Sequence, residues 1–503
     1  MTTTRFLLLA VFLAGCPTRF VGDPDAGAGG IAGGSIGVGG FGGKGAAPGG
    51  AAGGAGAGAG VAGGMMGTGG LGGSNTGGTP GTGGASGNSG SGGSGGSNSG
   101  GMPSGGGLSG HGGLGGSSIG GTSGTGGVGG SSGSNGGMGV LSVDCGAHTT
   151  CAVVSDRSVR CWGANDSGQL GTNDTMGASS PRTVLAGPGV PLSGAASVGV
   201  GDDHTCVLQV DGTVRCWGAA PAAGAVAAMI ATPLLTSAGT ALSGVAAIAA
   251  GSGHTCALLT GDGSAVCWGR DNAGQLGDGY DLPSPTPITV LGSTGFKISL
   301  LMQVIAGGDR TCAIDGNSHL KCWGDPSQPP GMYFVDGTGE PIGTVVTAAE
   351  GVAHGCAVQN NKQVICWGSN AGGQLGNSTV TDSAAFPVPV MATGGSLLSN
   401  AVSVVAGAMY SCALLDTGIV SCWGSNSQGQ LGNGSRFDSS SPVSVQMTGG
   451  GPLTGVVALA AGDAHACAVT EDRALWCWGD NGQGQIGNSS VADALQAVRV
   501  TLE

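Results

Sequence analysis

The sequence has few of the residues that fill an ordinary core and few that carry charge. Aromatic residues make up 4% of the 503 positions, and charged residues make up 9%. Lys and Arg total 15 against 28 Asp and Glu, which gives a formal net charge of −13. The basic residues do not cluster. A nucleic-acid partner requires a basic surface, so we expect no nucleic acid among the partners.

Motifs that carry catalysis are also missing. Beyond residue 140 there is no Gly-x-Ser-x-Gly elbow, no His-Glu-x-x-His helix and no phosphate-binding loop. Acidic pairs such as Asp202-Asp203 stand beside glycines, where a solvated turn is the simpler interpretation. We therefore predict that the protein is not an enzyme and holds no cofactor.

The first sixteen residues have the pattern of an export signal. Arg5 precedes an apolar run over residues 6–13, which is too short to span a membrane. The run ends in Leu-Ala-Gly-Cys16, which looks like a bacterial lipobox, so we expect Cys16 to be lipidated. An ordinary signal peptide with an incidental Cys is the alternative. Pro17 rather than Asp follows the Cys, which favours the outer membrane or cell surface within the cell envelope.

Residues 17–139 are rich in Gly and Ser and contain almost no charge. Such a composition cannot offset the entropy cost of ordering by burying a core. We expect a flexible linker over this range.

From residue 140 to residue 503 the sequence repeats itself seven times. Each repeat has a Gly, a frequent His three residues later, a Cys, and a β-rich run that ends in Cys-Trp-Gly. Five repeats continue into Asn-x-x-Gly-Gln-Leu-Gly or a close variant. The leading glycines are spaced by 44 to 56 residues. This spacing, with several short strands per repeat, predicts an all-β, seven-bladed β-propeller that follows a disordered Gly-rich tether.

These motifs resemble the repeat of the regulator of chromosome condensation family over about residues 140–503. The resemblance implies a seven-bladed propeller, in agreement with the repeat count. The chain departs from that family in having two cysteines per repeat, an acidic composition and an export signal. The closer functional analogy is with secreted bacterial propellers of this type, which bind another protein through one face.

The two cysteines of each repeat are predicted to form a disulfide. In the second repeat, a three-residue hairpin loop after Gln209 places Cys206 opposite Cys216. The third repeat has one more residue between its cysteines, and a four-residue loop over residues 260–263 restores the same opposition. Buried free thiols are the alternative. The predicted pairs are Cys151–Cys161, Cys206–Cys216, Cys256–Cys267, Cys312–Cys322, Cys356–Cys366, Cys412–Cys422 and Cys467–Cys477.

Cys145 is left over, and we interpret it as a buried spectator. The repeated histidines His204, His254, His354 and His465 are tempting metal ligands. Equivalent residues on neighbouring blades lie about 10 Å apart, whereas two ligands of one zinc lie within about 4 Å of each other. We therefore predict no metal site, and expect each His to bond its own turn or the next blade.

Recognition is expected where the repeats differ. The second and fourth repeats lack the Gly-Gln-Leu-Gly motif. The fourth instead carries Met332, Tyr333 and Phe334 on an expected loop, and we predict that these residues anchor a partner. Packing of the aromatics under that loop is the alternative.

We therefore expect a monomeric propeller anchored to a membrane through its N-terminal lipid. Its predicted function is protein–protein binding or adhesion, with an unidentified protein or glycan as ligand. A carbohydrate-binding or carbohydrate-processing propeller and a structural envelope protein are the alternatives.

Overall fold

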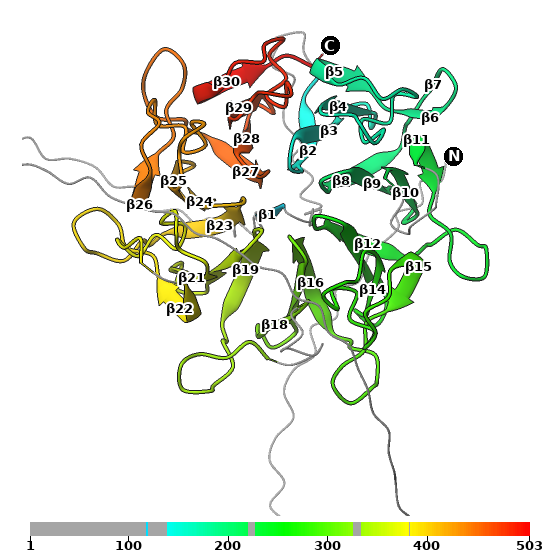
Figure 1. Ribbon diagram of the computed structural model, residues 1–503, viewed down its shortest axis with the longest axis horizontal. Helices are drawn as coiled ribbons and strands as arrows, with labels where there is room; N and C mark the ends of the chain where they lie inside the picture. Colours follow the sequence, from blue (N-terminus) through cyan, green and yellow to red (C-terminus); the bar gives the residue numbers. More distant parts are fainter. Residues whose placement is uncertain (1–116, 119–137, 220–226, 325–332, 382, 503) are drawn as a thin grey trace, which may run out of the picture. The chain divides into compact units, whose positions relative to one another are not determined.

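In the computed structural model, the chain forms a closed ring of seven β-sheets around a central axis (Figure 1). The structure describes residues 117–118, 138–219, 227–324, 333–381 and 383–502. The predicted signal peptide, Cys16 and nearly all of the predicted linker lie outside these residues. No helix in the described part of the chain is long and apolar enough to cross a membrane.

Each blade is an antiparallel sheet built from consecutive strands, and the first strand of each blade lies nearest the axis (Figure 1). Blades 1 to 3 consist of β2 (Val140–Cys145), β3 (Thr149–Val154), β4 (Val159–Gly163) and β5 (Ala178–Thr183); β8 (Ala195–Val200), β9 (His204–Gln209), β10 (Val214–Gly218) and β11 (Ala228–Pro233); and β12 (Val245–Ala250), β13 (His254–Leu259), β14 (Ala265–Gly269) and β15 (Ser284–Thr289).

Within the described residues, which leave out 325–332, blade 4 has three strands in its sheet and a bridge between Lys321 and Tyr333 at its outer edge. Blades 4 to 7 consist of β16 (Leu301–Gly307), β17 (Arg310–Asp315) and β18 (Leu320–Trp323); β19 (Val345–Glu350), β20 (His354–Gln359), β21 (Val364–Gly368) and β22 (Ala384–Pro389); β23 (Ala401–Ala406), β24 (Tyr410–Leu415), β25 (Val420–Gly424) and β26 (Ser439–Ser444); and β27 (Val456–Ala461), β28 (His465–Thr470), β29 (Leu475–Gly479) and β30 (Ala494–Val500).

Three short strands lie outside this scheme. β6 (Leu185–Gly187) and β7 (Val190–Pro191) form a small hairpin after blade 1. β1 (Ser117–Ser118) pairs in parallel with β27 of blade 7. The fold is therefore the predicted all-β, seven-bladed propeller, and the strands of blades 1 and 7 come from opposite ends of the propeller sequence without being shared.

The cysteine register agrees with the prediction. In every blade the two cysteines face each other on the second and third strands, with Cα atoms 4.0–4.1 Å apart, and the structure joins all seven predicted pairs. In blade 2, Gln209 N–H donates to Thr213 across a turn in which Gly212 has a φ of 78°. In blade 3, Leu259 N–H donates to Ser264 across the four-residue loop. Both predicted turns are confirmed.

Glycines at the axis bring neighbouring blades into backbone contact. The leading Gly of each repeat packs against the backbone carbonyl of the equivalent segment in the next blade, and the series closes from Gly462 back to Gly146. A Cβ atom at Gly146 would collide with the carbonyl oxygen of Gly201. The contact requires a residue without a side chain at this position, which explains why all seven repeats begin with Gly.

A second contact joins all seven blades in the same way. The first residue of each inner strand donates its N–H to the turn carbonyl of the preceding blade, at N–O distances of 2.9–3.1 Å. Across the closing seam, Val140 donates to Arg473 at 3.0 Å. The seam between the last and first blades therefore has the same backbone bond as the other six.

We predict that Gly146→Ala lowers the free energy of unfolding by about 3 kcal/mol, because a methyl group at the axis would force two backbones apart. Gly337→Ala is the matched control. An added Cβ there lies 3.8 Å from the nearest atoms, which belong to the Phe386 side chain. Chemical denaturation of both variants checks the prediction, and equal stability of the two would contradict the role of the axial contact.

Candidate functional site

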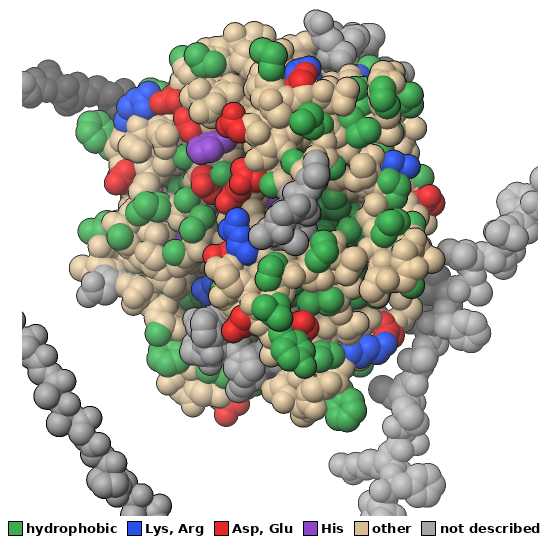
Figure 2. Space-filling view, turned by 45° about the vertical axis from the view of Figure 1, so that its right-hand side comes forward, with side chains coloured by type: hydrophobic (Ala, Val, Ile, Leu, Met, Phe, Trp, Pro, Cys, Tyr) green, Lys and Arg blue, Asp and Glu red, His purple; other side chains and the backbone are tan. Residues whose placement is uncertain are grey.

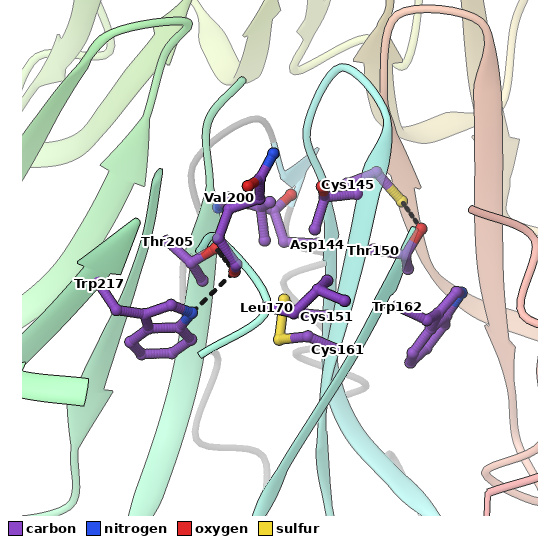
Figure 3. The surroundings of a disulfide bond; sticks show 12 residues. Asp144, Cys145, Thr150, Cys151, Cys161, Trp162, Leu170, Val200, Thr205 and Trp217 are labelled. Carbon is purple, nitrogen blue, oxygen red and sulfur yellow. Dashed lines mark hydrogen bonds between the residues drawn. A yellow bond between two sulfur atoms is a disulfide. The ribbon is translucent and has the colours of Figure 1, made fainter. Parts of the chain in front are cut away.

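The Gly-Gln-Leu-Gly loop of one blade holds the next blade through a single carbonyl oxygen. In the first seam, the Gln169 carbonyl accepts the indole N–H of Trp217 at 2.8 Å and the hydroxyl of Thr205 at 3.0 Å. Figure 3 shows Thr205 and Trp217 of blade 2 pointing toward the loop that carries Leu170. Trp162, Trp323, Trp423 and Trp478 make the same bond, each to a Gln of the preceding blade.

The repeated histidines complete this seam. His465 Nε2 lies 2.8 Å from the Thr150 hydroxyl, which donates its proton to the Gln485 carbonyl. The hydroxyl must therefore accept from Nε2–H, which leaves the buried Nδ1 as an unprotonated acceptor. His254 and His354 make the equivalent bonds to Thr311 and Ser411. The prediction that each His bonds the next blade is confirmed for these residues and for His204, which contacts Thr255.

Burial keeps these histidines neutral. It lowers the pKa of His204 and His354 to about 4 and that of His254 and His465 to about 3. Because these values lie well below neutral pH, the four rings carry no charge in ordinary conditions. They serve as hydrogen-bond donors between blades.

The seam between blades 4 and 5 replaces these parts with an ion pair. Blade 4 lacks the Gln loop, Arg310 stands in place of the His, and Gly355 stands in place of the Thr. Arg310 Nη1 lies 4.0 Å from Oε2 of the fully buried Glu350, whose pKa is raised by burial and lowered by Arg310 and by the Trp367 side chain. A side chain at Gly355 would collide with Trp367 and Glu350. The three changes therefore fit one another.

Glu350 also lies beside the disulfide of blade 4. Ligand atoms of Cys312, Cys322 and Glu350 lie within 4.8 Å of one another, which is the spacing of a metal site. The two sulfurs are bonded to each other, so neither offers the thiolate that a metal requires.

The three residues predicted to anchor a partner in blade 4 differ in their surroundings. Met332 lies outside the described residues. Phe334 is 6% exposed and packs on Trp367, with ring centroids 5.0 Å apart, so the prediction that it anchors a partner is wrong. The physical reason is the missing Gln loop of blade 4, since Phe334 occupies the core at that seam. Tyr333 is 41% exposed and lies against Lys321 and His319.

The seam between blades 2 and 3, where the Gln loop is also missing, contains a cavity of about 220 Å³. Its walls include Cys216 and Trp217 of blade 2 and Ser252, Trp268 and Arg270 of blade 3, with Asp203 at the turn of blade 2. Arg270 is half exposed and lies 3.9 Å from Asp309. The lining thus combines apolar rings with one cation and one carboxylate. We take this cavity, named the seam pocket, as the candidate functional site.

Neither Tyr333 nor Phe334, the two predicted anchor residues that the structure describes, lines the seam pocket. Its polar residues Asp203, Ser252 and Arg270 were missed because each is an ordinary turn residue in the sequence. The signal that could have found the pocket was the missing Gly-Gln-Leu-Gly motif in the second repeat. That signal marks two seams, and the sequence alone does not show which of them is filled.

A second, smaller cavity lies at the axis. It measures about 30 Å³ among the described residues, is lined by the axial glycines and has room for only a few water molecules. Asp202 and Asp463 also line it; burial raises both carboxyl pKa values, to about 6 for Asp202. Figure 2 shows one face of the molecule, on which acidic side chains gather near a His and a basic side chain.

Cys145 has the surroundings expected of a spectator. It is buried and unpaired, and the Thr150 hydroxyl lies 3.9 Å from its sulfur (Figure 3). Burial, followed by the charge of Asp144, raises the pKa of the Cys145 thiol well above its usual value. The thiolate is therefore scarce at neutral pH.

The fold and the repeated seams define the chain as a closed, disulfide-bonded seven-bladed propeller. Two models described as the Regulator of chromosome condensation (RCC1) repeat match it, one at residues 140–169, 245–275, 401–430 and 456–485, the other at residues 158–208, 362–414 and 417–469. The chain thus contains RCC1 repeats and folds as an RCC1-like propeller.

Two proteins of similar sequence are a plant receptor and a human ubiquitin ligase. The Ultraviolet-B receptor UVR8 of Arabidopsis thaliana is 29% identical over 370 residues, which cover 70% of this chain and 80% of the receptor. The Homo sapiens E3 ubiquitin-protein ligase HERC2 is 25% identical over 252 residues, and this match covers 48% of the chain and 5% of the ligase.

Among solved structures, the complex of Kap60 with yeast RCC1 (Prp20) matches with a TM-score of 0.54 at 19% identity, covering 72% of this chain and 84% of that one. The structure of Prp20p from Saccharomyces cerevisiae gives the same TM-score at 20% identity, covering 72% and 87%. At these identities the likeness shows the shared fold.

The seam pocket leads to a prediction about the disulfides. Cys216 is partly exposed in the pocket, whereas the other thirteen bridged cysteines are buried. Because thiol exchange requires access to sulfur, a small reductant should open Cys206–Cys216 before the other six bridges. Timed alkylation followed by peptide mapping measures the order. Simultaneous opening of all seven, or first opening of another pair, would contradict it.

Proposed function

We propose that this propeller is a binding module that holds another protein at the seam pocket, and that it performs no catalysis. In this proposal a lipid on Cys16 anchors the module in the cell envelope, and residues 17–139 act as its tether. The RCC1-like propeller is in general a protein-binding scaffold. The position of the contact on this particular ring is the new element of the proposal.

The observation that carries the proposal is the contrast between the two seams that lack a Gln loop. At the seam of blades 4 and 5, Phe334, Arg310 and Glu350 fill the space with the chain's own side chains. At the seam of blades 2 and 3, the described residues leave a cavity of about 220 Å³; residues 220–226, between the lining residues Ala219 and Ala228, lie outside the described part of the chain. An unfilled cavity lowers stability, so its presence favours a site for an outside group.

The lining indicates which group would enter. Trp217 and Trp268 offer apolar walls, and Arg270 and Asp203 offer opposite charges. The volume is small for a drug-sized ligand and suits one large side chain with a polar end. Aromatic side chains that fill such pockets dominate protein interfaces. Yeast Prp20 has been crystallised with Kap60 bound, and its binding to Gsp1p and histones has been characterised, which supports protein binding by this fold as an analogy.

Arg270→Ala combined with Asp203→Ala should weaken the partner complex by ~2 kcal/mol or more, because both charged groups frame the pocket. The partner is first captured with a photo-crosslinking residue at position 232, which lines the pocket, and identified by mass spectrometry, and its affinity is then measured with purified proteins. Arg436→Ala is the control, since Arg436 is 50% exposed, like the 51% exposed Arg270, and also lies beside one Asp, at 2.9 Å from Asp493 against 3.9 Å between Arg270 and Asp309.

Equal loss of affinity in the Arg436 control, or no loss in the pocket variant, would place the contact elsewhere on the ring. If the captured ligand is a glycan that the pocket variant no longer binds, the carbohydrate-binding alternative replaces the protein-binding one.

Cys16→Ser should abolish fatty-acid labelling and release the protein into the soluble exported fraction, because the thiol would be the only point of lipid attachment. Metabolic labelling and fractionation measure both effects. A variant that remains labelled and membrane-bound would show that the anchor lies elsewhere.

A further inference from the structure

The loop after the third strand of five blades is organised by one amide or carboxyl side chain. These residues are equivalent in the repeat: Asn165, Asp271, Asn370, Asn426 and Asn481. In each, Oδ1 accepts the N–H of the Leu or Ile five residues later at 2.8–3.0 Å. The five loops therefore share one internal geometry on this side of the side chain.

The other side of the Asn side chain is a donor surrounded by oxygen atoms. In blade 7, Asn481 Nδ2 donates to Asn488 Oδ1 at 3.2 Å, to the Ser490 carbonyl at 3.0 Å and to the Ala492 carbonyl at 2.9 Å. The equivalent atoms in blades 5 and 6 accept from Asn370 and Asn426. The loop thus forms an oxygen cage that the amide NH₂ fills.

Blade 3 has an acid, Asp271, where four other blades have the amide donor. The cage positions are Asp278, Tyr280 and Leu282, and Tyr280 N–H donates to Asp278 Oδ1 at 3.0 Å, as Ser490 N–H donates to Asn488 at 3.1 Å. Asp271 puts an oxygen where the other blades have the NH₂ group. Its side chain is fully buried; Oδ2 has no hydrogen bond of normal geometry, and besides Leu276 the nearby backbone donor is the N–H of Leu282.

The electrostatics of this loop are unfavourable without a positive charge. Burial raises the pKa of Asp271 to about 6, the backbone N–H groups of Leu276 and Leu282 oppose the rise, and nearby Asp278 and Asp281 add to it. Carboxylates and backbone carbonyls are hard oxygen ligands, the type that Ca²⁺ takes in irregular loops, whereas Mg²⁺ demands a strict octahedron.

We propose that the blade 3 loop is a Ca²⁺ site, with Asp271 and Asp278 as its carboxylate ligands and the cage carbonyls as further ligands. The bound cation takes the place of the amide NH₂ of the other blades. Asp281, which is exposed and lies on the same loop, adds negative charge at its entrance.

Full-length protein freed of cations is titrated with CaCl₂ by calorimetry. We expect one site per chain with a Kd of ~0.1–1 mM, the range of extracellular calcium modules. At 10 mM Ca²⁺, binding at this affinity raises Tm by about 2–4 °C for a domain of this size. The same concentration of MgCl₂ should give a much smaller rise.

Asp271→Asn is the decisive variant, because it installs the residue that four other blades already have. It should abolish the Ca²⁺ response while leaving Tm without cation equal to or above that of the original protein. Asp278→Asn matches Asn377, Asn433 and Asn488 at the same loop position and should weaken Ca²⁺ binding about tenfold. Asp416→Asn removes a distant exposed carboxylate, paired with Lys362, and should leave binding unchanged.

The proposal is overturned if the original protein shows no Ca²⁺ response, or if Asp271→Asn responds like the original protein. It is also overturned if Asp271→Asn is less stable than the original without cation, because Oδ2 would then have a favourable partner within the chain.

Discussion

The backbone contact at the axis is the constraint on which the rest of this structure depends. Seven inner strands can meet there only if each offers a residue without a side chain, and each repeat therefore begins with Gly. The close contact between backbones at the axial glycines also fixes the distance between neighbouring sheets. Residues farther from the axis then meet at constant positions, so one Gln carbonyl can hold a Trp and a Thr or Ser of the next blade. A single close contact thus sets the geometry of every regular seam.

Disulfides stabilise the blades from within, where this composition offers little aromatic core. Each blade has one Trp at the seam, and much of the remaining core is Ala, Val, Leu and Cys. A bridge across a hairpin of about eleven residues contributes at most about 2.8 kcal/mol in the chain-entropy model. The contribution acts within one blade, whereas the Gln, His and Trp bonds act between blades. The disulfides therefore stabilise each blade separately, the hydrogen bonds stabilise the contacts between blades, and both are repeated around the ring.

Much of the fold could be predicted because the repeat reports the same physical requirement seven times. The spacing of Cys206 and Cys216 fixed their register, and the extra residue in the third repeat tested it. The fate of Phe334 could not be predicted in the same way. An aromatic on a non-repeated segment fits both a surface anchor and a seam filler, and the choice depends on the space that a missing Gln loop leaves. Likewise, Arg270 and Asp203 become a site only through the three-dimensional gap between blades 2 and 3.

In a repeat protein, a residue that differs from the rest can be judged against its equivalents, because the other six blades show which contacts that position normally makes. At the seam of blades 4 and 5, the loss of His and Thr is matched by Arg310, Glu350 and Gly355, so packing within the chain accounts for the change. At the seam of blades 2 and 3, and at Asp271, the change is present and the compensation within the described residues is not. Both features cost stability in the isolated chain. Local sequence choices that conflict with the fold concentrate at functional sites, and these two positions are therefore where an outside partner would restore what the chain lacks.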